Sequence, residues 1–300
     1  MLIGEGRGIR VHAIDAGDVR LDGGSMFGVV PKTLWSRGIE ADERNRIPMK
    51  MRCLLVETPE RRILVDTGAG NKTSEKLRAI YGIDNEGEPT RLETSLQTVG
   101  VEPEDVDLVV ATHLHFDHAG GQTTLRDDGS IVPAFPNARY VIRRGEWHAG
   151  HSANRRIRSS YTRADFDPLE EACVLELVEG DQEIVPDVLL VGLPGHTADH
   201  QGVLIDLGEE IVWFPCDLVP TSAHLRLSWI MAYDLEPLVT LATKERWLTR
   251  AGREGWRIVF PHDHAVVSGR AAPSEKGVGC VLEDIVNEPG FAPVNDRGQG

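Results

Sequence analysis

Short apolar runs separated by polar turns follow one another along most of the chain. Residues 51–66, MRCLLVETPERRILVD, place two apolar runs on either side of a Thr-Pro-Glu-Arg turn, which is typical of a β-hairpin. Most later runs end in a loop that is rich in glycine, proline, histidine or aspartate. We expect further strands at 106–111, 140–142, 174–178, 187–193, 203–205, 211–214 and 258–260.

Helical spacing of apolar residues appears between these strands. Thr73 and Ser74 can each cap a short helix, and a second one fits residues 92–99. A longer helix is expected to begin with Asp234 as its N-cap and to end at Gly252 and Gly255. Helices therefore alternate with strands in both halves of the chain.

No repeat or low-complexity linker divides the 300 residues. We therefore predict a single domain over 1–300, with a loose tail at about 288–300, where glycine, proline and asparagine are common. Hairpins in both halves, with helices between them, indicate an α/β (α+β) fold in which two sheets pack face to face and the helices lie outside.

The composition and charge of the chain exclude some classes of binding partner. A formal net charge of −15 opposes binding to nucleic acid, which depends on basic side chains. No apolar run reaches the ~18 residues of a membrane span, and the first residues lack the pattern of a signal peptide. The four scattered cysteines are typical of reduced thiols. We expect a cytoplasmic protein that acts on a small molecule, and a homodimer is left open.

The densest group of potential metal ligands lies in residues 112–121, THLHFDHAGG. His113 and His115 follow a predicted strand, where positions i and i+2 point to the same side, so both imidazoles can reach one cation. Asp117 and His118 come after the chain turns and point to a neighbouring position. The pattern therefore predicts two metal ions side by side.

Three further ligand-type residues each follow a predicted strand in the second half of the chain. They are His196, Asp217 and His262, and we expect them to converge with the histidine-rich loop at one edge of the fold. His264 competes with His262, which we prefer because it lies nearer the strand end, where its position is better fixed. His200 is expected to be a buried, hydrogen-bonded residue instead of a ligand.

These motifs, in this order, resemble those of the metallo-β-lactamase superfamily, and most closely its quorum-quenching, lactonase-like branch. The resemblance rests on LVDTGAG, THLHFDHAGG, LPGHTADH, the Cys-Asp pair at 216–217 and PHDH, and it covers residues 65–264. It implies a four-layer αββα sandwich. It also implies a first metal held by His113, His115 and His196, a second held by Asp117, His118 and His262, and a bridging Asp217.

By the same resemblance, Asp66 would hydrogen-bond near the ligands without binding metal itself; a turn-stabilising role is the alternative. Imidazole and carboxylate donors suit two zinc ions and tolerate iron, manganese or cobalt. Such a pair can generate a bridging hydroxide that attacks a carbonyl or phosphoryl centre. Asp217 and Asp117 are the expected catalytic carboxylates, with Asp117 as the proton shuttle.

The expected reaction is hydrolysis of a lactone or an ester-like small molecule, and N-acyl-homoserine lactones are the candidate substrates. Segments 23–35 and 217–234 resemble the lactonase-like branch. One departure is Pro220, which stands where many of these lactonases carry a carbonyl-binding tyrosine; Tyr233 or His224 could replace it. The candidate pocket residues, with core packing as the alternative for the apolar ones, are Phe27, Trp35, His224, Trp229, Met231 and Tyr233.

Two other activities of the same fold stay open from the sequence. One is hydrolysis of organophosphate triesters or other esters, which needs the same pair of metals. The other is a mononuclear iron persulfide dioxygenase, which metal analysis would separate from a dinuclear, lactonase-like hydrolase of the EC 3.1 class.

Overall fold

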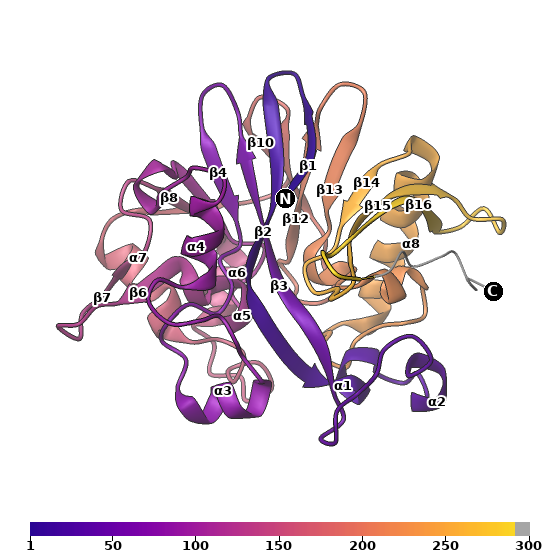
Figure 1. The fold of residues 1–300 in the computed structure, drawn as a ribbon, viewed down its shortest axis with the longest axis horizontal. Helices are drawn as coiled ribbons and strands as arrows, with labels where there is room; N and C mark the ends of the chain where they lie inside the picture. Colours follow the sequence, from indigo (N-terminus) through magenta and orange to yellow (C-terminus); the bar gives the residue numbers. More distant parts are fainter. Residues whose placement is uncertain (292–300) are drawn as a thin grey trace. The chain divides into compact units, whose positions relative to one another are not determined.

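The computed structural model describes residues 1–291 (Figure 1). Within it the chain divides into two compact units. The first comprises Met1–Val19 and Lys50–Gly180, and the second comprises Arg20–Met49 and the residues from Asp181 onward. Of the tail predicted at 288–300, residues 292–300 lie outside the described residues. The single domain over 1–300 stays a prediction.

The first unit is built on a seven-stranded sheet with the order β1-β2-β3-β4-β5-β8-β9. Its strands are β1 (Leu2–Gly6), β2 (Ile9–Asp22), β3 (Arg46–Glu57), β4 (Arg62–Val65), β5 (Leu108–Val110), β8 (Arg139–Arg143) and β9 (Leu175–Val178). The hairpin predicted at 51–66 is present as β3 and β4, which pair antiparallel. From β4 to β9 the neighbouring strands run parallel, so their carboxyl ends share one edge of the sheet.

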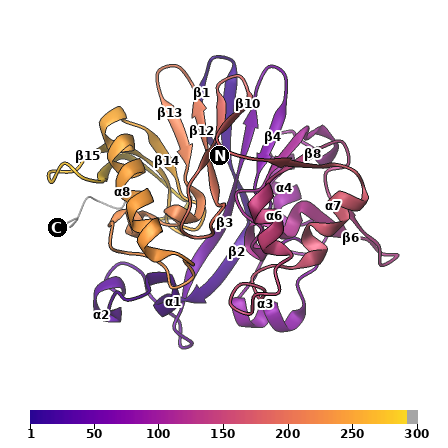
Figure 2. The same ribbon diagram turned by 180° about the vertical axis from the view of Figure 1, so that it is seen from behind.

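The helices of the first unit lie between these strands along the chain. They are α3 (Glu75–Tyr81), α4 (Arg91–Gln97), α5 (Phe116–Ala119), α6 (Arg144–Gly150) and α7 (Asp167–Glu171), with short 3-10 turns η1 (Pro103–Asp105), η2 (Gly120–Gln122) and η3 (Arg163–Asp165) and a small hairpin of β6 (Thr123–Leu125) and β7 (Ile131–Pro133). Ser74 caps α3, as expected, by accepting a hydrogen bond from Leu77 N–H. Helices α4 and α6 flank β4 and β8 (Figure 2).

The second unit contains a seven-stranded sheet with the order β10-β11-β12-β13-β14-β15-β16. Its elements are α1 (Gly23–Phe27), α2 (Lys32–Trp35), β10 (Gln182–Val185), β11 (Val188–Gly192), β12 (Gln201–Asp206), β13 (Ile211–Phe214), η4 (Cys216–Leu218), η5 (Ser222–Leu225), α8 (Pro237–Glu254), β14 (Arg257–Val259), β15 (Val266–Pro273) and β16 (Cys280–Asn287). Strands β13 and β14 are parallel, and β11 has their direction because two antiparallel pairings separate it from β13. The loops after β11, β13 and β14 therefore leave the sheet at one edge.

Helix α8 covers one face of this second sheet (Figure 2). Three buried indole rings form the centre of its contact: Trp213 of β13 lies 5.8 Å from both Trp247 of α8 and Trp256, measured between ring centroids. Aromatic pairs of this kind contribute about 0.5–1.5 kcal/mol beyond the area they bury. This packing gives the loops beyond β13 and β14 a rigid base.

Two glycine contacts hold the histidine-rich loop of the first unit against the loop that follows β4. A Cβ atom on Gly120 would lie 2.4 Å from the carbonyl oxygen of Ala69, so only glycine permits this approach of the two backbones. Gly121 N–H completes the contact by donating to the Gly68 carbonyl at 3.0 Å. The pair of glycines in the predicted motif therefore has a packing role.

Three sequence predictions need correction. Asp234 is not the N-cap of the long helix: α8 has Glu236 at that position, and the Asp234 carboxylate is bonded elsewhere. His113 and His115 do not continue a strand, because β5 ends at Val110. The run at 174–193 holds three strands instead of two, and Gly180, at a left-handed φ of 68°, separates β9 from β10.

Candidate metal centre

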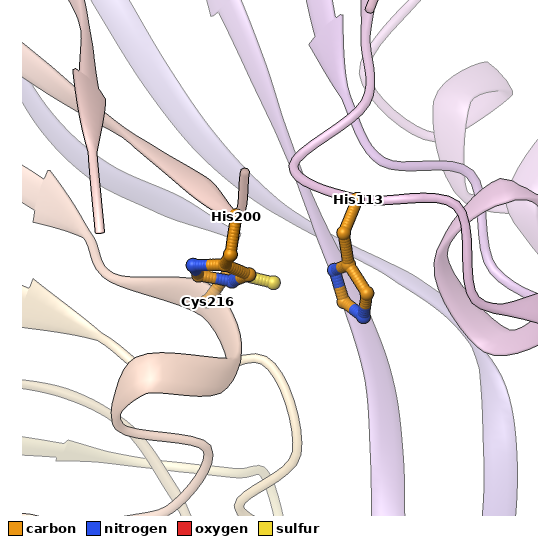
Figure 3. Close-up of side chains that lie close together, drawn as sticks. All are labelled: His113, His200 and Cys216. Atoms are coloured by element: carbon orange, nitrogen blue, oxygen red, sulfur yellow. The ribbon is translucent and has the colours of Figure 1, made fainter. Parts of the chain in front are cut away.

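Each unit carries its own group of potential ligands, at the edge where its parallel strands end. In the first unit, Asp66 follows β4, His113 follows β5 on a loop (Figure 3), and Glu146 lies in the helix that follows β8. Since these three strands are adjacent and parallel, the topology brings the three side chains to one place.

Three imidazole rings of the first unit cluster tightly. The ring of His113 lies 4.5 Å from that of His115 and 4.2 Å from that of His118, between centroids. His113 and His118 are buried, and the Nε2 atom of His118 lies 3.7 Å from an oxygen of Asp117. The four ligand-type residues of the predicted motif are therefore brought together, although two of them come from a loop and two from helix α5.

Asp66 organises this group through both of its carboxylate oxygens. Oδ1 accepts from Thr112 N–H at 2.8 Å, and Oδ2 accepts from Thr112 Oγ1 at 2.9 Å and lies 3.0 Å from His118 Nδ1. Asp66 is 1% exposed and adopts a left-handed φ of 60°. Its contacts orient His118 and the residue before His113, which is the expected behaviour of a carboxylate that supports ligands.

Replacing Asp66 with asparagine should weaken metal binding by about 10–100-fold. Asparagine tolerates the left-handed backbone, but its amide cannot accept at both former oxygen positions. The measurement is competition between the apoprotein and a chromogenic chelator. Asp127→Asn, an exposed aspartate of the same unit, is the matched control, and equal metal affinity of the two variants would contradict this role of Asp66.

Glu146, which was not predicted from the sequence, is a buried carboxylate beside the same loop. Its Oε1 accepts from Leu114 N–H at 3.0 Å and from the Tyr161 hydroxyl at 2.7 Å, and the Tyr161 ring packs edge-on against His115 at 5.0 Å. Glu146 therefore fixes the backbone between two candidate ligands. No local pattern marks it, because it lies 31 residues beyond His115 in a separate helix.

In the second unit, Asp217 lies between two histidines. Its Oδ2 lies 3.3 Å from Nε2 of His196, and its Oδ1 lies 3.1 Å from Nε2 of His262. All three residues are at most 5% exposed. Each carboxylate oxygen thus faces a different imidazole nitrogen, an arrangement that suits a carboxylate shared between two cations.

Two ligand-type residues of the second unit, His196 and Asp217, have further contacts that orient them. His196 Nδ1 contacts Asp234 Oδ1 at 2.8 Å. His200 Nδ1 contacts the Leu193 carbonyl at 3.1 Å, and its Nε2 accepts from Asp217 N–H at 3.2 Å, so this imidazole orients the Asp217 backbone. Asp234 is a functional candidate that the sequence analysis assigned to a helix cap.

Cys216 and His200 lie together, with donor atoms within 4.8 Å of each other (Figure 3). Cys216 is fully buried, as expected for a small residue at this position, and has a left-handed φ of 46°. His264, the alternative to His262, is half-buried and packs edge-on against Phe291 at 5.4 Å between ring centroids. Of these two histidines, His262 is the one that faces Asp217.

The donor set fits a metal ion. In His118 and His196 the Nδ1 atom contacts a buried carboxylate while Nε2 faces a candidate ligand carboxylate, which is the usual orientation of metal-binding imidazoles. Nitrogen and carboxylate donors suit zinc and related transition metals.

The candidate pocket residues all belong to the second unit, and four of them form one aromatic group. Phe27 stacks on His224 at 4.9 Å and on Trp35 at 5.3 Å, and it meets Trp229 edge-on at 5.4 Å. Phe27, Trp35 and His224 are buried, as is Met231, whereas Trp229 and Tyr233 are half-buried.

His224 is engaged through both ring nitrogens. Nε2 contacts the Met26 carbonyl and Nδ1 contacts Thr221 Oγ1, each at 2.8 Å. Burial lowers the pKa of His224 to about 3, so the ring is neutral at physiological pH. Because both ring nitrogens of His224 contact other groups of the protein, this imidazole is a weak substitute for a carbonyl-binding tyrosine, and Tyr233 stays the other proposed one.

Comparison with known proteins agrees with this picture. Residues 52–262 match the family model described as the metallo-beta-lactamase superfamily, and the chain belongs to that superfamily. A probable metal-dependent hydrolase from Staphylococcus aureus has 30% sequence identity and a TM-score of 0.84, over 95% of this chain and 100% of the other. The predicted fold class, with two mixed sheets and flanking helices, is confirmed.

The relatives include lactonases. An N-acyl homoserine lactonase from Bacillus cereus is 35% identical over 174 residues, which span 54% of this chain and 60% of the lactonase. This chain therefore covers less than two-thirds of that relative. A solved N-acyl homoserine lactone hydrolase, with the product N-hexanoyl-L-homoserine at its catalytic metal centre, has 27% identity and a TM-score of 0.66, over 84% of this chain and 92% of the other.

The predicted resemblance to the superfamily and to its lactonase-like branch is confirmed. The prediction of a metallo-hydrolase of this fold with lactonase homologues is also confirmed at that level, while the two-metal mechanism, the identity of the metal and the lactone substrate stay predictions. Within residues 1–291, no helix combines the length and the apolar character that crossing a membrane requires.

Proposed function

We propose that this chain is a metal-dependent hydrolase that opens the ring of a lactone with an acyl side chain, such as an N-acyl-homoserine lactone. The observation that carries the proposal is the placement of Asp217, whose two oxygens face the Nε2 atoms of His196 and His262. The lactonases among the relatives supply the substrate class.

We further propose that the seven predicted ligands hold two zinc ions. His113, His115 and His196 would bind one, Asp117, His118 and His262 the other, and Asp217 both. The clustering of the imidazoles within the first unit and the two-sided contacts of Asp217 within the second support this assignment. When bound, the two ions would supply a water molecule of lowered pKa and would polarise the substrate carbonyl.

The side chains of the protein would do the remaining work. Asp117 would carry a proton to the alkoxide that leaves when the ring opens, since that oxygen must be protonated. Asp66 and Asp234 would keep the imidazoles of His118 and His196 oriented with Nε2 forward. Tyr233 would donate a hydrogen bond to the substrate carbonyl in place of the tyrosine that Pro220 replaces.

The acyl chain would lie against the aromatic group of the second unit. Trp229 is half-buried and packs against the buried ring of Phe27. A partly exposed indole that packs on a buried ring offers contact area to an aliphatic chain at low conformational cost. Substrates with a longer acyl chain should therefore bind better than those with a short one.

The test is a substrate panel on the zinc-loaded enzyme together with metal analysis. We expect about two metal ions per chain and a kcat/KM for acyl-homoserine lactones at least about tenfold above that for aryl esters and phosphotriesters. Removal of metal by a chelator should abolish the activity, and readdition of zinc should restore it. A higher kcat/KM for the phosphotriester, or full activity of the metal-free protein, would refute the proposal.

A further inference from the structure

Lys244 is a lysine of helix α8 that is 1% exposed, although most lysines are on the surface. Its Nζ donates to the carbonyl oxygens of Arg226 at 2.9 Å and Trp229 at 2.7 Å. Both acceptors lie in the segment 226–234, which has no regular secondary structure. A single buried ammonium group therefore holds two backbone points of an irregular segment against a helix.

Burying this ammonium group is costly. Burial lowers the pKa of Lys244 to about 7, and only the charge of Asp234 acts in the opposite direction. A methionine would fill similar space in a helix without that cost. The advantage of a lysine over a methionine here is therefore that its hydrogen bonds fix the position of the segment 226–234.

The segment 226–234 carries Trp229, which lies at the proposed acyl-chain site, and Asp234, which contacts the proposed metal ligand His196. The carbonyl of Trp229 accepts a hydrogen bond from Lys244, and its half-buried indole packs on Phe27. At the other end, Asp234 contacts His196 Nδ1. The Arg226 guanidinium lies over the Trp229 ring at 4.6 Å and adds a contact within the segment.

We propose that Lys244 is a positioning residue that holds Trp229 in place as the wall of the acyl-chain site and so sets the preference for lactones by chain length. The predicted effect on substrate preference rests on the proposed lactonase function. The contacts by which Lys244 holds the segment do not depend on it. Lys244 acts through the backbone and through Trp229 and touches no reacting atom. Its loss should therefore raise KM for long-chain lactones and leave kcat and metal content nearly unchanged.

The experiment compares Lys244→Met with Lys76→Met, which removes an exposed lysine from helix α3. For Lys244→Met we expect kcat/KM to fall about tenfold on a decanoyl lactone and less than about threefold on a butanoyl lactone, mainly through KM. Lys244→Gln, which keeps an amide donor, should give an intermediate ratio and replaces the methionine variant if that one does not fold. Lys76→Met should match the wild type.

Two further measurements separate positioning from a general loss of stability. In a Trp229→Ala background, Lys244→Met should change the decanoyl-to-butanoyl ratio by less than about twofold, because the wall is already absent. Amide hydrogen exchange of peptides covering 226–234 should be faster in Lys244→Met than in the wild type. A ratio within twofold of the wild type for Lys244→Met overturns the proposal.

The proposed lactonase function and the proposed role of Lys244 can fail separately. If the wild-type enzyme opens no lactone, the proposed function is wrong, and hydrogen exchange alone then decides whether Lys244 tethers the segment. Unchanged exchange in 226–234 would remove the positioning role even if lactones were hydrolysed.

Discussion

Replacing Asp217 with asparagine is expected to lower kcat/KM on an acyl lactone by roughly a thousandfold, about 4 kcal/mol of transition-state stabilisation. The reason lies in the contacts of the two oxygens, each of which faces an imidazole nitrogen. An amide has the same shape but carries no charge, and it presents a donor where one oxygen was. A cation on that side would lose a ligand.

The same variant should hold about one metal ion per chain where the wild type holds about two, measured by plasma mass spectrometry on the dialysed protein. Glu209→Gln, an exposed carboxylate of the second unit, is the matched control and should behave as the wild type. Retention of both ions and of kcat/KM within tenfold by Asp217→Asn would show that this carboxylate is not shared between metals.

Replacing Lys72 with methionine should cost about 3–5 kcal/mol of folding stability at pH 8, a loss on the order of 10 °C in Tm. Lys72 and Asp165 form an ion pair at 3.2 Å with side chains only 7% and 6% exposed. Lys72 Nζ also donates to the carbonyl groups of Gly120 and Thr123. Without the lysine, a buried carboxylate has lost its counter-charge.

The loss should be smaller at pH 5. Burial raises the pKa of Asp165 to about 6, and the coulombic effect of Lys72 opposes that rise, so the pKa should lie higher still in Lys72→Met. A carboxyl whose pKa is raised on folding stabilises the protein at low pH, and this contribution disappears as the pH rises through the folded-state pKa. The variant therefore loses stability over a wider pH range than the wild type.

Urea unfolding at pH 5 and pH 8 measures this difference. The double variant Lys72→Met/Asp165→Leu should recover most of the loss at pH 8, because replacing both partners leaves no buried charge. Lys276→Met, an exposed lysine, is the control. An equal loss at both pH values would mean that the carbonyl contacts of Lys72, and not its charge, stabilise the fold.

The sequence was most informative where the apolar pattern ends in a polar loop. The strands before His113, Asp217 and His262 were expected because their cores are continuous apolar runs, and they are present as β5, β13 and β14. Strands β1, β2, β15 and β16 were not expected. In β2, polar residues interrupt the run IRVHAIDAGDVRLD and hide its 14-residue length.

Asp66 was predicted as a supporting residue of the site, but three others, Lys244, Glu146 and Asp234, could not be predicted from the sequence. Lys244 and Glu146 bind backbone groups, which every residue carries, so no partner motif marks them. Asp234 stands shortly before a proline at a helix start, a pattern that favours a cap, but its tertiary contact with His196 determines its role. Long-range hydrogen bonds of this kind appear only once the chain is folded.

The division of the chain into units has a consequence for biosynthesis. Unit 1 is complete in the nascent polypeptide once residue 180 has left the ribosome, whereas residues 20–49 belong to unit 2, whose remaining residues begin at 181. Phe27 of helix α1 is therefore synthesised long before His224, the residue whose ring stacks on it in the folded protein. During this interval the Phe27 side chain lacks a contact that helps to bury it in the folded protein, and exposed apolar surface of this kind favours aggregation of nascent chains.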